Sequence, residues 1–186
     1  MKALFLFVFM FLVGFNIFAE GKFPNKHQFE VKNPDGRIFE LDSDVQNIFD
    51  VLGEPLKKEN LWAMYPNASC ALYWIEYDGI AFMYYDINNK LVRIVINDEK
   101  YRIVDNDITV GATYEKIIES YGNPERSAEY FNEQNSRKEL QLVYSTENTD
   151  LSYVEQTAEH YYWIVFNIDV ETQKCNSIYV NWNVDN

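Results

Sequence analysis

Two histidines and two cysteines are the residues of this chain whose side chains most often catalyse reactions or bind metals. A general base or a zinc site needs a histidine close to a nucleophile or to a second ligand. His27 lies in an irregular N-terminal segment, His160 begins a predicted strand, and neither has a patterned partner. We therefore interpret both as surface histidines, and we predict no metal site and no catalytic residue.

Acidic residues gather in front of two predicted helices, at residues 42–44 and 105–107. They could hold Ca²⁺, but they lack the spacing and the terminal glutamate of a calcium-binding loop. The favourable interaction of negative charge with a helix N-terminus explains the first cluster more simply. Glu115 and Glu119 lie on a solvated helix face, whereas a hydrolase needs an apolar pocket that separates the pKa values of its two carboxyl groups.

The composition excludes several classes of function. The chain has 186 residues, with 16 Lys and Arg against 29 Asp and Glu, and its net charge of -13 argues against nucleic-acid binding. Its content of 47% hydrophobic residues is that of a folded domain rather than of a disordered acidic chain. Gly-x-Ser-x-Gly, His-Glu-x-x-His, phosphate-binding and Cys-x-x-Cys motifs are absent from the sequence. We predict a protein that is not an enzyme and needs no cofactor.

The first nineteen residues have the pattern of a secretion signal. Lys2 precedes an uncharged apolar run over residues 3–18, and Ala19 provides the small residue at the cleavage position. The run is shorter than the roughly 20 apolar residues of a membrane-spanning helix, and no cysteine follows it directly to carry a lipid. We predict a periplasmic or secreted protein without a stable membrane anchor; a retained signal segment is the alternative.

Export would place Cys70 and Cys175 in a compartment where a disulfide can persist. A bond between them would close a loop on the order of 100 residues and stabilise the fold by up to about 4.7 kcal/mol. Two buried thiols are the alternative, because a free cysteine packs like a small apolar side chain. The sequence leaves both possibilities open.

Two segments of the chain, residues 41–55 and 110–124, align with each other without a gap. Each has a residue, Asp44 or Thr113, whose side-chain oxygen can accept a hydrogen bond from the first turn of a helix. Each continues with apolar residues at the spacing of one helix face and ends in Gly-x-Pro, which stops a helix. The sequence therefore predicts two short, related helices.

After each predicted helix the sequence alternates as an antiparallel meander does. The predicted strands cover residues 72–77, 80–86 and 91–97 in the first copy and 139–144, 161–169 and 175–182 in the second. No Gly-, Pro- or Ser-rich linker separates the copies, so we predict one shared sheet.

The predicted fold is α+β, with two helix-plus-antiparallel-meander repeats that share one sheet and with the helices on one face. We divide the chain into a signal peptide (1–19), an irregular lead-in (20–36), repeat 1 (37–100) and repeat 2 (101–186).

A helix that ends in Gly-x-Pro and is followed by a meander resembles the small outer-membrane assembly lipoprotein (SmpA/OmlA, or BamE-like) type of domain. The local motif is the Gly-Ala-Thr…Tyr-Gly-Asn-Pro run over residues 111–124, with its twin at 42–55. Two such units in one exported chain resemble the β-lactamase inhibitory protein architecture. The resemblance covers most of residues 37–182. It implies helices packed on one side of a continuous sheet whose concave side binds another protein.

The predicted strands carry large side chains on both faces of the sheet. Two short helices can cover only one of these faces. If Tyr73, Ile75 and Tyr77 face the helices, Trp74 lies on the other side. Alternation and the repeat alignment then add further candidates to that side, namely Phe82, Tyr84, Arg93, Trp163 and Tyr179. Aromatic and arginine side chains dominate the energy of protein interfaces. A second core layer covered by a loop is the alternative.

We predict that the chain is an exported, non-catalytic module that binds another protein, as an inhibitor or as an envelope accessory factor. Its negative charge would speed encounter with a basic partner surface. Binding of a glycan or another small molecule to the aromatic face is the main alternative, and an unrecognised hydrolase is a further one.

Overall fold

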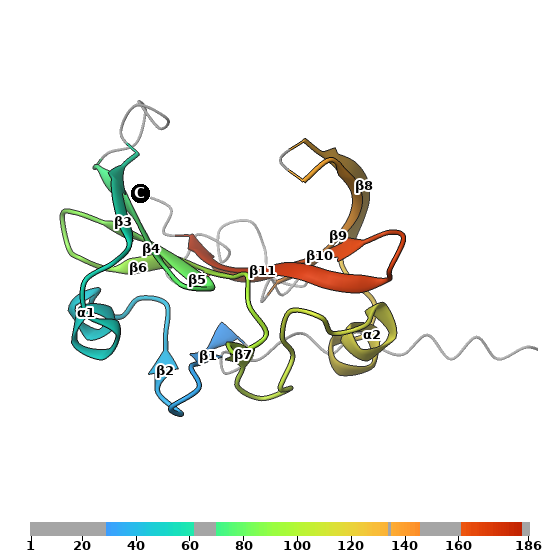
Figure 1. Ribbon diagram of the computed structural model, residues 1–186, viewed down its shortest axis with the longest axis horizontal. Helices are drawn as coiled ribbons and strands as arrows, with labels where there is room; N and C mark the ends of the chain where they lie inside the picture. Colours follow the sequence, from blue (N-terminus) through green and yellow to red (C-terminus); the bar gives the residue numbers. More distant parts are fainter. Residues whose placement is uncertain (1–28, 62–69, 134, 146–160, 184–186) are drawn as a thin grey trace, which may run out of the picture.

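The computed structural model describes residues 29–61, 70–133, 135–145 and 161–183. These residues form a large sheet, a small sheet and two short helices (Figure 1). The proposed signal segment, His27 and His160 lie outside the described residues, so the interpretations given for them stay predictions.

The large sheet has eight strands, and all of its neighbouring pairs are antiparallel. In spatial order the strands are β3 (Lys57–Asn60), β4 (Leu72–Tyr77), β5 (Ile80–Tyr85), β6 (Leu91–Ile96), β11 (Lys174–Asn183), β10 (Tyr161–Asp169), β9 (Arg137–Ser145) and β8 (Arg126–Asn132). In chain order, strands β3 to β6 therefore follow one another from one edge of the sheet to its centre, and strands β8 to β11 do so from the opposite edge. They meet at the central pair of β6 and β11.

Each half of the large sheet follows a short helix, α1 (Gln46–Leu52) or α2 (Tyr114–Tyr121). The Asp44 carboxylate accepts a hydrogen bond from the Gln46 backbone amide at 2.8 Å. The Thr113 hydroxyl accepts one from the Lys116 backbone amide at 3.3 Å. Both helices lie on the same side of the sheet (Figure 1). No helix in the described part of the chain is long and apolar enough to span a membrane.

A small sheet lies between the helices, on the same side of the large sheet (Figure 1). Its order is β2 (Ile38–Phe39), β1 (Val31–Lys32) and β7 (Arg102–Ile103). The Phe39 ring meets the Phe82 ring of β5 edge to face, with 5.3 Å between ring centroids. The end of the lead-in and the segment that joins the two halves therefore cover the middle of the large sheet.

The prediction of an α+β protein built from two helix-plus-meander repeats is wrong, because the described residues are mostly β, with 50% strand and 12% helix. The residues that follow each Gly-x-Pro form β3 and β8, which the sequence pattern does not mark as strands. β3 consists of polar, exposed residues, and β8 is exposed along almost its whole length. Edge strands of this kind lack the apolar alternation that reveals a strand packed on a core.

The helix-facing side of the large sheet carries the core. The register places one row of buried side chains across six strands, formed by Ile75, Phe82, Ile94, Val180, Ile164 and Tyr144. Ile48 of α1 and Ile117 of α2 are buried and belong to the same cluster. Burial of apolar side chains is the main stabilising contribution to such a fold, and here it fixes which face of each strand points away from the helices.

Candidate protein-binding face

The face of the large sheet that points away from the helices is concave. At both ends the sheet bends away from the helices, so that the edge strands β3 and β8 rise on either side of this face (Figure 1). We call it the concave face and define it by the register of the strands. Its residues alternate along each strand with those of the core row.

Three of the predicted partner-binding residues share one row of the concave face. From β4 to β10 the cross-strand partners in this row are Trp74, Met83, Arg93, Asn181 and Trp163. Tyr179 lies in the adjacent row, between Val95 and Val165. Trp74, Arg93, Trp163 and Tyr179 are all half-buried, so the fold brings these four predicted residues together on one surface.

Polar partners hold the side chains at the β4 end of this row. The Trp74 indole donates a hydrogen bond to the Glu76 carboxylate at 2.7 Å. On the neighbouring strand, Lys57 forms an ion pair with Glu59 at 3.0 Å. Because Glu59 lies opposite Trp74 and Lys57 lies opposite Glu76, the indole is surrounded by charges of both signs.

Phe82 and Tyr84 do not belong to the concave face. They are 0% and 4% exposed, and they point toward the helices. The Tyr84 ring stacks on Tyr73 with 5.4 Å between centroids, and Phe82 packs on Phe39. The prediction fails at these two positions because every residue of β5 is apolar or aromatic, so its sequence has no contrast that distinguishes the two faces.

Cys70 and Cys175 are free thiols, so the possible disulfide between them is not formed. Cys175 is buried on the helix-facing side, and burial raises the pKa of its thiol to about 12. A protonated thiol is a poor nucleophile. Cys175 therefore contributes to packing.

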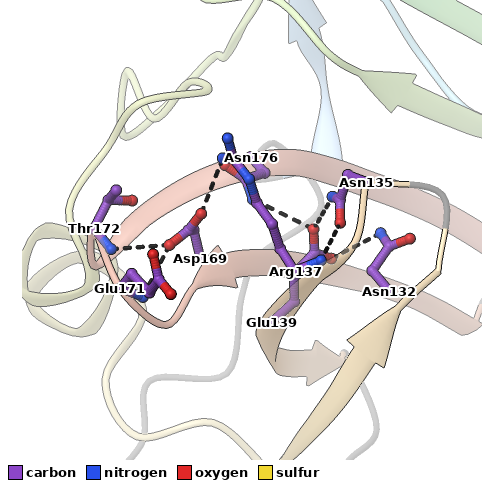
Figure 2. Close-up of polar contacts among 8 residues, drawn as sticks. All are labelled: Asn132, Asn135, Arg137, Glu139, Asp169, Glu171, Thr172 and Asn176. Atoms are coloured by element: carbon purple, nitrogen blue, oxygen red, sulfur yellow. Dashed lines mark hydrogen bonds and ion pairs between the residues drawn. The ribbon is translucent and has the colours of Figure 1, made fainter.

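A polar cluster that the sequence analysis missed lies at the β8 end of the concave face (Figure 2). At its centre lies Glu139, a residue that is 2% exposed. Its carboxylate accepts hydrogen bonds from Tyr130 at 2.5 Å, Asn135 at 2.6 Å, Asn132 at 3.2 Å and Asn176 at 3.3 Å. We call these five residues the Glu139 cluster. They link β8, β9 and β11 with the turn between β8 and β9.

A second buried carboxylate, Asp169, lies opposite Glu139 in the register of β9 and β10. It accepts hydrogen bonds from the backbone amides of Glu171 and Thr172, both at 2.9 Å, and from the Arg137 guanidinium at 3.0 Å (Figure 2). These contacts hold the turn that connects β10 to β11. They also compensate the cost of burying a charge.

The two carboxyl groups are ionised at neutral pH. Burial raises the pKa of Glu139, but the hydrogen bonds from its neighbours outweigh burial and lower the pKa below its ordinary value. The Thr172 amide lowers the pKa of Asp169 most; burial opposes this, and the Glu171 amide and Arg137 lower the pKa further. A pair of catalytic carboxyl groups instead needs one raised pKa. The two hydrogen-bonded carboxylates are therefore suited to stabilise the β8–β9 hairpin.

No set of three or more His, Cys, Asp or Glu side chains that could hold a metal ion occurs within the described residues.

The Glu139 cluster had no signal in the sequence, because its donors come from positions 130, 132, 135 and 176. Only the pairing of the strands brings them to Glu139.

No protein family matches the chain by its sequence profile, and no curated protein matches it. One similar solved structure is an extracellular protein containing an SCP domain from Bacillus anthracis str. Ames, with a TM-score of 0.46 and 14% identity over 76% of this chain and 43% of that chain. Another is a cysteine-rich secretory protein from Staphylococcus aureus subsp. aureus Mu50, with a TM-score of 0.41 and 9% identity over 76% and 42% of the two chains.

A third structure is a Streptococcus mutans protein provisionally described as a beta-lactamase inhibitor protein, with a TM-score of 0.25 and 21% identity over 72% of this chain and 78% of that chain. The present chain spans less than half the length of the first two structures. Likenesses at these TM-scores identify neither a family nor a function. The resemblance to the BamE-like domain type therefore stays a prediction.

Proposed function

We propose that this protein is an exported, non-catalytic module that binds another protein through the concave face of its large sheet. The observation that carries the proposal is the row of Trp74, Met83, Arg93, Asn181 and Trp163 across five strands. Half-buried tryptophan and arginine side chains form a partly dehydrated surface of the kind that supplies most of the binding energy in protein interfaces.

The rigidity of the sheet supports this function. The opposite face is covered by the helices and the small sheet, and its core row is buried across six strands. A surface held in this way loses little conformational entropy when a partner binds, which favours affinity. The Glu139 cluster adds support at the β8 end, where the hairpin would otherwise be free to open.

The net charge of the protein mainly affects the rate of association. The concave face carries both signs, and several of its charges already form ion pairs, such as Lys57 with Glu59 and Arg137 with Asp169. The net charge of -13 therefore acts at long range and attracts partners with a basic surface. Added salt should slow association with little change in the dissociation rate.

Affinity capture with matched variants tests the proposal. The folded protein is immobilised and exposed to an extract of its source cells, alongside Trp74→Ala and Trp163→Ala. Phe131→Ala is the control, because Phe131 is an aromatic residue of β8 that is 59% exposed and lies on the other face of the strand. We expect a discrete partner that both tryptophan variants lose and the control retains.

Circular dichroism and thermal unfolding establish that each variant is folded. Equal capture by all three variants would contradict the proposal. A ligand that is not a protein would also contradict it, and quenching of tryptophan emission by sugars would reveal a glycan.

A further inference from the structure

Arg93 lies at the centre of the large sheet, where its two halves meet. It belongs to β6, and Asn181 of β11 is its cross-strand partner. On the other side its partner is Met83, and Val95 follows it along the strand on the same face. Met83 and Val95 are buried, and Arg93 itself is half-buried. The cation is therefore partly removed from water in an apolar setting.

Within the part of the chain that the structure describes, the Arg93 side chain donates one hydrogen bond. A guanidinium has five N–H donors, and here Nε donates to the Asn181 side-chain oxygen at 2.6 Å. Among the described residues, no carboxylate forms an ion pair with Arg93. Arg102 and Arg137, by contrast, pair with Asp107 and Asp169, each at 3.0 Å.

Asn181 fixes the orientation of the guanidinium. Asn181 is 2% exposed, and its amide nitrogen donates to the backbone carbonyls of Trp163 at 3.5 Å and Tyr179 at 3.3 Å. These bonds direct its oxygen toward Nε of Arg93. With Nε held in this way, the two terminal nitrogens form a fork with four N–H donors, for which no acceptor occurs in the described ranges. A planar fork of this kind matches the two oxygens of a carboxylate.

A partly buried cation without an anion is unfavourable, and a partner that supplies the anion relieves the cost. We propose that Arg93 determines the specificity of the concave face by binding an Asp or Glu side chain on a projecting loop of the partner. This inference rests on the proposed function and makes it more specific. Trp74 and Trp163 pack around the loop and exclude water from the ion pair.

Long-range attraction and the central contact require opposite charges on the partner. The net charge of -13 favours a basic partner during approach, whereas the central contact requires an acidic side chain. The partner is therefore a protein whose surface is basic overall and whose contact loop combines an acid with apolar residues. Composition alone predicts only the first of these properties.

A library of disulfide-closed, nine-residue loops displayed on phage is the probe for this test. Selection is done on the full folded protein, on Arg93→Gln and on Arg102→Gln. Glutamine keeps a donor for Asn181, and Arg102 is the control because it lies in the small sheet and already pairs with Asp107. We expect enrichment of Asp or Glu at one loop position on the wild-type protein and on Arg102→Gln, and no enrichment on Arg93→Gln.

Synthetic loops then provide a double-mutant cycle. Replacement of the selected Asp by Asn should weaken binding to the wild-type protein by about tenfold or more, as measured for close charge pairs at interfaces. The same replacement should have little effect on binding to Arg93→Gln. An equal loss on both proteins would overturn the inference.

The outcomes distinguish this inference from the proposed function. If the selected loops require Trp74 and Trp163 but show no acidic preference, the concave face binds proteins and Arg93 does not select them. If the selected loops bind Trp74→Ala and Trp163→Ala as well as the wild-type protein, both the proposed function and this inference fail.

Discussion

Tyr77 of β4 and Tyr144 of β9 make the same contact in the two halves of the large sheet. Each hydroxyl donates to the backbone carbonyl of the glycine that ends the preceding helix, Gly53 at 2.8 Å or Gly122 at 3.0 Å. Each ring also meets a phenylalanine edge to face, with centroids 6.1 Å and 5.9 Å apart. On the helix-facing side, the two halves use the same connection between helix and sheet.

The concave face differs between the same two halves. The β4–β5 end carries Trp74 beside Met83, whereas the β8–β9 end carries the Glu139 cluster. Side chains that pack between layers must fit their neighbours closely. Those on the other face of an antiparallel sheet contact solvent or a partner and are less constrained. The shared contacts on the helix-facing side maintain the fold in both halves. The difference between the halves lies on the concave face, for which we propose the binding function.

The largest expected effect is that of Glu139→Ala. The substitution leaves four donors without their acceptor, and we expect the free energy of unfolding to fall by about 3 kcal/mol, since hydrogen bonds to charged groups contribute about 1.5–3 kcal/mol each and water replaces part of the loss. Urea unfolding followed by circular dichroism measures the change. Glu76→Ala is the matched control in the other half and should lose less, because Glu76 is half-buried and accepts one hydrogen bond from Trp74.

Acid provides a second readout of the same variant. Because folding lowers the pKa of Glu139, its stabilisation is complete above the ordinary pKa of a glutamate, about 4.3, and is lost as the pH falls through the folded value. Stability of the wild-type protein should therefore decline below about pH 4 more steeply than that of the variant. Parallel declines would show that Glu139 does not stabilise the fold through its charge.

Smaller effects are expected from Tyr144→Phe and Tyr77→Phe, each of which removes one hydrogen bond. We expect a loss of about 1 kcal/mol for each, with the larger loss at Tyr144 because this residue is buried and Tyr77 is half-buried. Neither substitution touches the concave face, so partner capture should be unchanged. An effect on capture without an effect on stability would contradict the separation between the two faces.

The predictable part of the fold is the set of strands rich in β-branched and aromatic residues. The predicted strands at residues 72–77 and 91–97 match β4 and β6 to within one residue, because β-branched, aromatic and other large apolar residues dominate both runs. The small sheet is not predictable in this way, since its strands are two residues long and gain stability only by packing on the large sheet. The edge strands β3 and β8 escape prediction because they are exposed and lack apolar alternation. The prediction of the α+β class was therefore wrong.

Contrast between neighbouring side chains decides which site residues could be assigned to a face of the sheet. Trp74 and Arg93 alternate with buried residues, Ile75 and Ile94, so their face could be predicted from the sequence. Phe82 could not be placed, because its neighbours in β5 are equally apolar. Asn181, which orients Arg93, lies 88 positions away in the chain, and only the β6–β11 pairing reveals its role.

Site-specific photocrosslinking tests the central claim most directly. A benzophenone amino acid replaces Tyr179 on the concave face or Phe131 on the other face of β8, and the protein is irradiated in its source cells. If the concave face binds a partner, position 179 should give a discrete crosslinked protein and position 131 should give none. Crosslinks from position 131 alone, or identical products from both positions, would contradict the account.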